Sequence, residues 1–267
     1  MNKRALLAGS MILFLSACGT NNSWEEEEKT IEVSNRIITE DVQVKWELDD
    51  NQASGKETLI RLRITNNEKP VDEFAVNHEK LLHLIIVSKD LSYFNHIHPE
   101  YKGDGVFEIK NKFPAGGEYR MVADFKPTDG NSMSKLEWVK VEGKSSQPKA
   151  VTIDNSFEKL VDDKKISLSV DPQLEAGKEL TLKFTISDKS TNQPISDLEP
   201  YLGSIGHVVI FSEDGGRYLH VHALENQGRG PEALFETTFP ESGVYKIWGQ
   251  FQKDGEVFTV PFVVNVP

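Results

Sequence analysis

The chain has 267 residues and a mass of 30.0 kDa, which is long enough to bury one large core or two of ordinary size. Its formal net charge of −12 counts against nucleic acid as a partner and against docking on anionic lipid headgroups, because an acidic surface repels phosphate groups. The one cysteine, Cys18, excludes an intramolecular disulfide. Burial of apolar side chains therefore has to stabilise the fold.

The first residues have the pattern of a bacterial lipoprotein signal. Lys3 and Arg4 precede an apolar run from Ala5 to Leu15, which falls short of the roughly 20 residues that a membrane-spanning helix needs. The lipobox-like sequence Leu-Ser-Ala-Cys ends at Cys18, which predicts cleavage before this residue and a diacylglycerol on its sulfur. An ordinary secretory signal with a chance cysteine is the alternative.

Cleavage at this point would remove residues 1–17 as a signal peptide and take the net charge from −12 to −14. Residues 18–35 include the acidic run Glu25 to Glu28 and have no apolar period, so we expect them to form a flexible stalk behind the lipidated cysteine. The predicted location is the extracytoplasmic face of the cell membrane, with the membrane as a partner through the lipid anchor.

The rest of the chain is predicted to be all-β, because its apolar residues alternate with a period of two between turn residues. The expected strands in the first half are 42–48, 57–65, 81–88, 93–98, 105–113, 118–125 and 135–141, and those in the second half are 165–170, 179–187, 206–212, 217–222, 233–239, 244–252 and 257–266. Seven strands in about a hundred residues are typical of an immunoglobulin-like β-sandwich. We therefore expect two tandem sandwiches, at 36–143 and 156–267, joined by a polar linker at 144–155.

An internal repeat supports two domains. In each half a loop that begins with Phe-Pro ends in Gly-x-Tyr, at Tyr119 and at Tyr245, as in the tyrosine corner of immunoglobulin-like domains. Two residues later an antibody domain would carry a core cysteine, whereas this chain has Met121 and Ile247. Apolar packing is therefore expected to replace the disulfide.

The strongest functional signal is a repeated group of histidines on a predicted hairpin. His83, His96 and His98 recur 124 residues later as His207, His220 and His222, so six of the seven histidines fall in two triads of the same spacing. Only His78 has no counterpart, because Leu202 stands at the corresponding position.

Hairpin geometry allows each triad to bind one ion. His96 and His98 share a strand face, and an antiparallel register in which paired residue numbers add up to 179 or 181 places His83 on the same face. Three imidazoles suit Cu(II) or Zn(II), with copper the stronger binder. We predict metal sites at His83, His96, His98, His207, His220 and His222, and the sequence leaves open whether they form two separate sites or one joint site.

The sequence also allows roles other than metal binding for the histidines and their neighbours. The histidines could be structural, each bonding a backbone carbonyl, and Met121 is a candidate soft ligand for which a core position is the better assignment. Ser88 and Asp90 sit roughly 15 Å from the histidine end of the hairpin, too far for a Ser-His-Asp triad, so turn chemistry is expected there. No activated nucleophile or acid–base pair is evident, and the chain is not expected to be an enzyme.

The hairpin pattern, the Gly-x-Tyr stretch and the lipobox together resemble the YtkA-like, FixH-related domains of bacteria. The resemblance covers residues 36–266 and implies immunoglobulin-like modules on surface lipoproteins near copper-handling systems, with His83, His96, His98 and their repeats at the family's histidine positions. It implies a surface-anchored, metal-associated protein. We therefore predict a membrane-anchored lipoprotein that binds a transition metal, with copper favoured, for delivery, buffering or resistance, and with a membrane metal transporter as a candidate partner. A noncatalytic adhesion module with structural histidines is the competing expectation.

Overall fold

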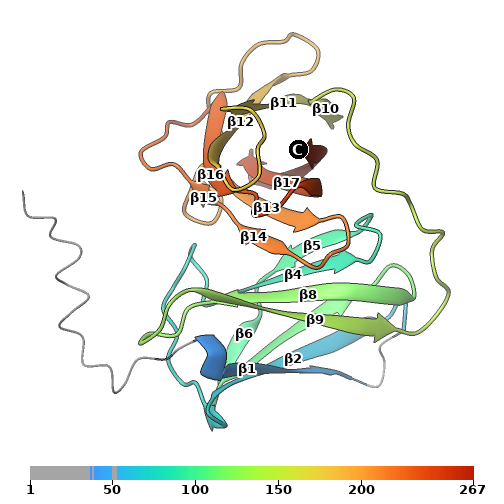
Figure 1. The fold of residues 1–267 in the computed structure, drawn as a ribbon, viewed down its shortest axis with the longest axis vertical. Helices are drawn as coiled ribbons and strands as arrows, with labels where there is room; N and C mark the ends of the chain where they lie inside the picture. The colour runs from blue at the N-terminus through green and yellow to red at the C-terminus, as the bar shows by residue number, and fades with distance from the viewer. Residues whose placement is uncertain (1–36, 38, 50–52) are drawn as a thin grey trace, which may run out of the picture. The chain divides into compact units, whose positions relative to one another are not determined.

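The computed structural model describes residue 37, residues 39–49 and residues 53–267, and it confirms the all-β prediction. The signal peptide, Cys18 and the stalk to residue 35 lie outside the described residues. Four antiparallel sheets form two tandem sandwiches (Figure 1). No helix in the described part of the chain is long and apolar enough to cross a membrane.

In the first repeat, one sheet has the order β1-β2-β7-β6 with β3 beside β2, and the other has the order β5-β4-β8-β9. A short 3-10 helix at Thr39–Asp41 precedes them. The strands are β1 (Val42–Leu48), β2 (Glu57–Asn66), β3 (Lys69–Pro70), β4 (Leu82–Ser88), β5 (Phe94–Ile97), β6 (Glu100–Gly103), β7 (Val106–Lys112), β8 (Gly117–Phe125) and β9 (Met133–Val141). The prediction missed the short β3 and β6, which have too few residues to show a period.

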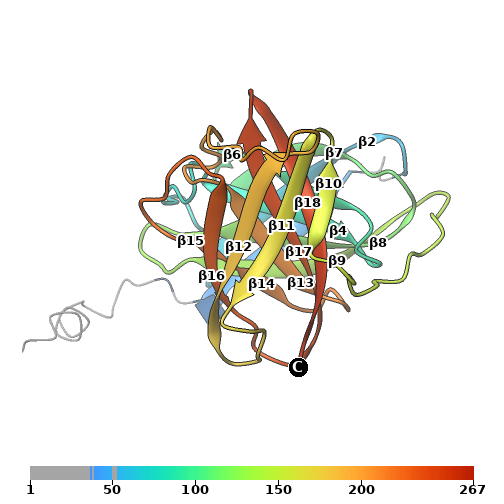
Figure 2. The same ribbon diagram turned by 90° about the horizontal axis from the view of Figure 1, so that it is seen from above.

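In the second repeat, the sheets have the orders β10-β11-β12-β16-β15 and β14-β13-β17-β18 (Figure 2). The strands are β10 (Glu158–Val161), β11 (Lys164–Asp171), β12 (Glu179–Asp188), β13 (His207–Ser212), β14 (Tyr218–His220), β15 (His222–Ala223), β16 (Glu232–Thr238), β17 (Gly243–Lys253) and β18 (Glu256–Val266). The predicted strand at 217–222 is in fact two strands, because the chain crosses from one sheet to the other at Val221.

Each sandwich encloses its own core. In the first repeat the fully buried side chains include Leu62, Ile86 and Met121, and in the second they include Phe184, Ile210 and Ile247. Met121 and Ile247 thus occupy the place of the missing disulfide, as predicted. Both tyrosine corners are present: Tyr119 donates to the carbonyl oxygen of Ala115 at 2.7 Å, and Tyr245 donates to that of Glu241 at 2.9 Å.

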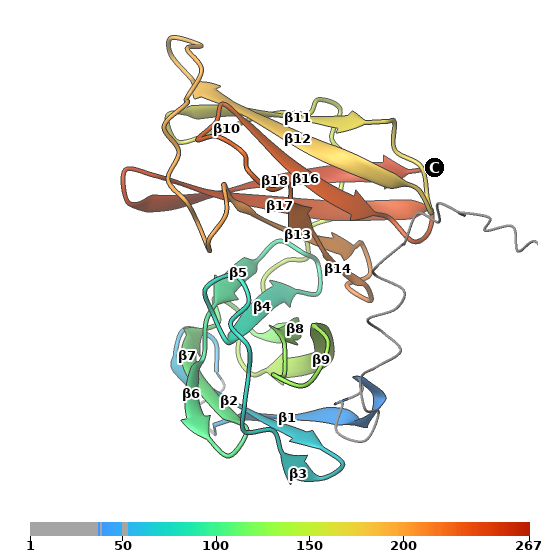
Figure 3. The ribbon, with the colours of Figure 1, turned by 90° about the vertical axis from the view of Figure 1, so that its left-hand side faces the viewer.

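A third buried cluster lies between the sandwiches. Its members come from the outward face of the β4 sheet in one repeat and of the β13 sheet in the other, and they are Ile85, Val87, Leu91, Val122, Val209, Phe211 and Trp248. Figures 1 and 3 both show β4 and β5 beside β13 and β14. Strand β4 is consequently buried on both of its faces, and the histidines lie on the face that the other repeat covers.

Candidate metal centre

The register of β4 with β5 brings three histidines together. Leu84 pairs with Ile97 and Ile85 pairs with His96, so paired residue numbers add up to 181, which is one of the two predicted registers. At the next position along the hairpin, His83 therefore faces His98, and their ring centroids are 5.0 Å apart. The predicted arrangement of the first triad on one face is confirmed.

The triad is withdrawn from solvent because the second repeat covers this face of the sheet. His83 is 3% exposed and His96 is 8% exposed, whereas His98, just beyond the end of β5, is half-buried. One ligand atom of each histidine lies within 4.8 Å of the others, so the triad could hold a metal ion. Among the described residues, no other group of histidine, cysteine and acidic side chains meets this condition.

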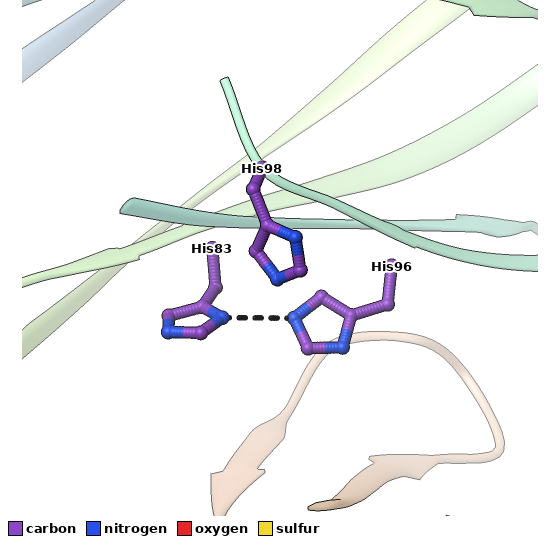
Figure 4. A group of neighbouring side chains, drawn as sticks. All are labelled: His83, His96 and His98. Atoms are coloured by element: carbon purple, nitrogen blue, oxygen red, sulfur yellow. Dashed lines mark hydrogen bonds between the residues drawn. The ribbon is translucent and has the colours of Figure 1, made fainter. Parts of the chain in front are cut away.

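The nitrogens of the three rings converge on a common point. His83 Nδ1 lies 3.0 Å from His96 Nε2, and the His98 ring lies beside the gap between them (Figure 4). Two nitrogens bound to one ion at about 2.0 Å each are roughly 3.3 Å apart at a tetrahedral angle. The nitrogens of the triad are between 3.0 Å and 4.8 Å apart, which brackets this value. Small movements of the rings would therefore suffice for coordination.

The outer hydrogen bonds of His83 and His96 indicate which nitrogen of these two rings carries the proton. His83 Nε2 donates to the carbonyl oxygen of Asn77 at 2.9 Å, because a carbonyl can only accept. His96 Nδ1 donates to Gln250 Oε1 at 2.8 Å, and the amide nitrogen of Gln250 donates to Thr259 Oγ1 at 3.4 Å. In the neutral rings, the two nitrogens that face each other therefore both present lone pairs.

Two facing lone pairs at 3.0 Å repel each other unless a cation lies between them. A proton is held poorly there, since burial and the neighbouring histidines lower the pKa of His96 to about 3 and that of His98 to about 4. In addition, His98 Nε2 is buried without a hydrogen-bond partner among the described residues. This donor set could hold a metal ion, because the second nitrogen of a metal-binding histidine commonly bonds a carbonyl or carboxylate.

A buried carboxylate lies next to the triad. Asp124 on β8 pairs with His83 on β4, is 2% exposed, and favours positive charge on His96. Its Oδ2 accepts a hydrogen bond of 2.8 Å from the hydroxyl of Tyr218 in the second repeat. Burial, followed by the charge of Asp124, raises the pKa of that hydroxyl well above its usual range. Asp124 thus supplies negative charge that favours a cation at the triad.

The predicted second triad is placed differently. His207 lies against the first triad: its ring is stacked on that of His83 at 5.6 Å between centroids and lies 4.8 Å from that of His96. His222 is exposed on β15, where it pairs with Glu236 in the other sheet. The side chain of His220 is outside the described part of the structure, so a second ion at this trio stays a prediction.

Sequence reasoning missed four residues of this site. His78, which has no repeat partner, lies 6.1 Å from His83 and 5.4 Å from His207 between ring centroids. Asp124 and Gln250 belong to segments distant in sequence from the first hairpin, whereas Asn77 acts through its backbone carbonyl, which a side-chain pattern does not mark. One available signal was the uninterrupted apolar run that follows each first histidine, since such runs indicate a strand buried on both faces.

The other candidate residues have structural roles. Met121 faces the core of the first sandwich, on the opposite side of the sheet from the histidines. Ser88 donates to Asp90 at 2.6 Å, and Ser212 donates to Asp214 at 2.5 Å, within the two hairpin turns. The turn chemistry expected for these residues is confirmed.

Solvent reaches the triad through a pocket of about 590 Å³ that His96 and His98 line. Its other walls include Glu79 and Lys80 from the first repeat and the segment Pro200 to Leu202 from the second. An ion at the triad would therefore have three protein ligands and a side open to water or to a small ligand, as metal sites that exchange a ligand do.

The fold and the site define a tandem immunoglobulin-like β-sandwich protein with a buried histidine triad that could hold a metal. The chain belongs to the family described as Domain of unknown function (DUF8832), whose model matches residues 38–143 and 159–267. The two matched ranges coincide with the two sandwiches.

No curated protein matches the sequence. Among solved structures, the chain is similar to a two-domain fibronectin type III segment of chicken tenascin, with 17% identity, 83% of this chain and 98% of that chain covered, and a TM-score of 0.24. Domains 4 and 5 of the S-layer protein SbsC give 15% identity, 84% and 97% coverage, and a TM-score of 0.24. Invasin, a bacterial integrin-binding protein, gives 12% identity, with 83% of this chain and 39% of that chain covered, and a TM-score of 0.24. Scores this low carry no information about what the present chain binds.

Proposed function

We propose that this protein binds one transition-metal ion through His83, His96 and His98 and has no catalytic activity of its own. The observation that carries the proposal is that His83 Nδ1 and His96 Nε2 face each other at 3.0 Å in a buried site, while the second nitrogen of each of these rings bonds an acceptor oxygen. A metal ion would remove the repulsion between their lone pairs and would also give buried His98 Nε2 a partner.

Copper is the metal that we favour, with zinc as the alternative. Neutral imidazoles bind both ions, and divalent copper binds nitrogen sites more tightly than zinc by the general affinity order. A thiolate-bound electron-transfer centre is not part of the proposal, because Cys18 is the only cysteine and lies far along the chain from the triad. The carboxylate of Asp124 would offset part of the charge of a divalent ion.

We further propose that the protein is a lipoprotein on the extracytoplasmic face of the cell membrane. The lipobox at Cys18 and the resemblance to YtkA-like modules support this location. A site with an open side suits an ion that is taken up and released, which fits delivery, buffering or protection together with a membrane metal transporter. Replacing Cys18 with Ser should move the protein from the membrane fraction to the soluble fraction.

The metal can be tested on the mature chain carrying Cys18→Ser, purified without a histidine tag. After incubation with Cu(II) or Zn(II) and removal of free metal, we expect one tightly bound ion per chain, measured by elemental analysis. A His96→Ala, His98→Ala double variant should lose this ion, whereas the matched variant His222→Ala, which changes an exposed histidine, should keep it.

Two results would overturn the proposal: wild-type protein that retains much less than one ion, or a double variant that binds as tightly as the wild type. Either result would favour a noncatalytic surface interaction module in which the histidines are structural.

A further inference from the structure

The metal site of the first repeat is completed by residues of the second. Gln250 on β17 accepts the hydrogen bond from His96 Nδ1 at 2.8 Å and is itself 5% exposed. The ring of His207 on β13 lies parallel to that of His83, within 10°, and 4.8 Å from that of His96. These contacts join segments about 110 to 150 residues apart, on opposite sides of the boundary between the sandwiches.

The contacts follow from equivalent positions in the two repeats. His83 pairs with Asp124 across β4 and β8, and His207 pairs with Gln250 across β13 and β17. Both strand partners also contact the other repeat: Gln250 accepts a hydrogen bond from His96, and Asp124 accepts one from Tyr218 at 2.8 Å. The repeats therefore exchange hydrogen bonds at the histidine end of the interface.

Gln250 decides the proton position on His96. Since Gln250 Oε1 holds the proton of His96 on Nδ1, His96 Nε2 keeps its lone pair directed at His83 and His98. Without an acceptor there, the proton is free to move to Nε2, and a protonated nitrogen cannot bind a metal. Outer partners of this kind typically change metal affinity by about 10-fold to 100-fold when they are removed.

We propose that Gln250 is a positioning residue of the metal site, and that the triad has its full affinity only while the second repeat is docked on the first. The inference rests on the proposed metal-binding function and assigns to the second repeat the role of a clamp. Linkage then requires that the metal stabilise the docked arrangement to the same extent that docking increases metal affinity.

The test is a Zn(II) titration of the mature Cys18→Ser chain by calorimetry or by competition with a chelator. Gln250→Leu removes the acceptor, and we expect zinc to bind about 10-fold to 100-fold more weakly. Gln250→Glu restores an acceptor, and its affinity should equal or exceed that of the wild type. Lys246→Met is the matched control, because it removes another hydrogen bond between the repeats, from Lys246 to the carbonyl oxygen of Leu91, away from the triad. Because the buried cluster of Ile85, Val209 and Trp248 still holds the repeats together in this variant, zinc affinity should stay unchanged.

A second readout separates positioning from general damage to the interface. Nitrogen-15 NMR of the metal-free protein should show the His96 proton on Nδ1 in the wild type and in Gln250→Glu but not in Gln250→Leu. The inference is wrong if Gln250→Leu binds zinc like the wild type, or if Lys246→Met weakens binding as much as Gln250→Leu does. If wild-type protein binds no zinc and no copper, the proposed function itself fails, which is a distinct result.

Discussion

The two histidine hairpins have the same spacing but different surroundings. In the first repeat, His98 lies just past the end of β5 and stays close to His83 and His96. In the second repeat, the equivalent His222 belongs to β15, which pairs with β16 in the other sheet. The equivalent histidines of the two repeats therefore lie on segments that pair differently, because the second hairpin crosses from one sheet to the other at Val221.

A proline explains part of this difference. Pro99 follows His98, and Ala223 follows His222 at the equivalent position. Ala223 pairs with Phe235 as part of β15, whereas Pro99 lies between β5 and β6. Because proline has no amide proton to give to a strand partner, pairing in the first repeat begins only at Glu100, and His98 remains close to His83 and His96.

Substitution of His83 and of His207, which occupy equivalent positions in the two repeats, is the strongest test of this comparison. His83→Ala removes a ligand and should weaken copper or zinc binding by more than about 100-fold, beyond the range for outer residues. His207→Ala, at the equivalent position of the second repeat, removes only a covering ring and should weaken binding by about 10-fold or less. Competition with a chelator measures both values. Equal losses in the two variants would mean that His207 is also a ligand.

Acid stability should also distinguish the two hairpins. The pKa of His96 is about 3 in the folded protein and about 6.5 in an unfolded chain, so between these values the unfolded state binds a proton that the folded state does not. Stability of the metal-free protein should therefore fall as the pH drops below 6.5, and His96 should contribute about 2 kcal/mol of this loss at pH 5. Urea unfolding in the presence of a chelator would measure this.

The comparison for acid stability uses one variant from each hairpin. His96→Gln keeps a polar side chain but removes the titrating group, and its stability should depend less on pH. His222→Asn changes an exposed histidine and should behave like the wild type. Equal pH dependence in all three proteins would contradict the burial argument.

The smallest expected effect concerns the proline. Pro99→Ala permits the first hairpin to pair as the second one does, which would draw His98 away from His83 and His96. We expect metal affinity to fall by about 10-fold, which corresponds to about 1.4 kcal/mol. Ala223→Pro is the reciprocal variant and should leave the affinity of the first site unchanged. A Pro99→Ala variant with wild-type affinity would show that other contacts hold His98 in place.

Most of the fold was predictable because period-two patterns depend only on neighbouring residues. The tyrosine corners, the replacement of a disulfide by Met121 and Ile247, and the hairpin turns at Ser88 and Ser212 follow from local chemistry and are confirmed. The short strands β3, β6 and β10 were missed, since pairing with a neighbour rather than an apolar pattern makes them strands.

The sequence by itself determined two β-sandwiches and the shared face of His83, His96 and His98, because side-chain direction along a strand alternates with residue number. Only the tertiary structure decided that this face is buried against the other repeat, that Gln250 and Asn77 set the proton positions, and that His207 joins the first triad. Apart from the bond between His83 and Asn77, these contacts bring together residues from distant segments, and local patterns carry no information about which sheet faces will meet.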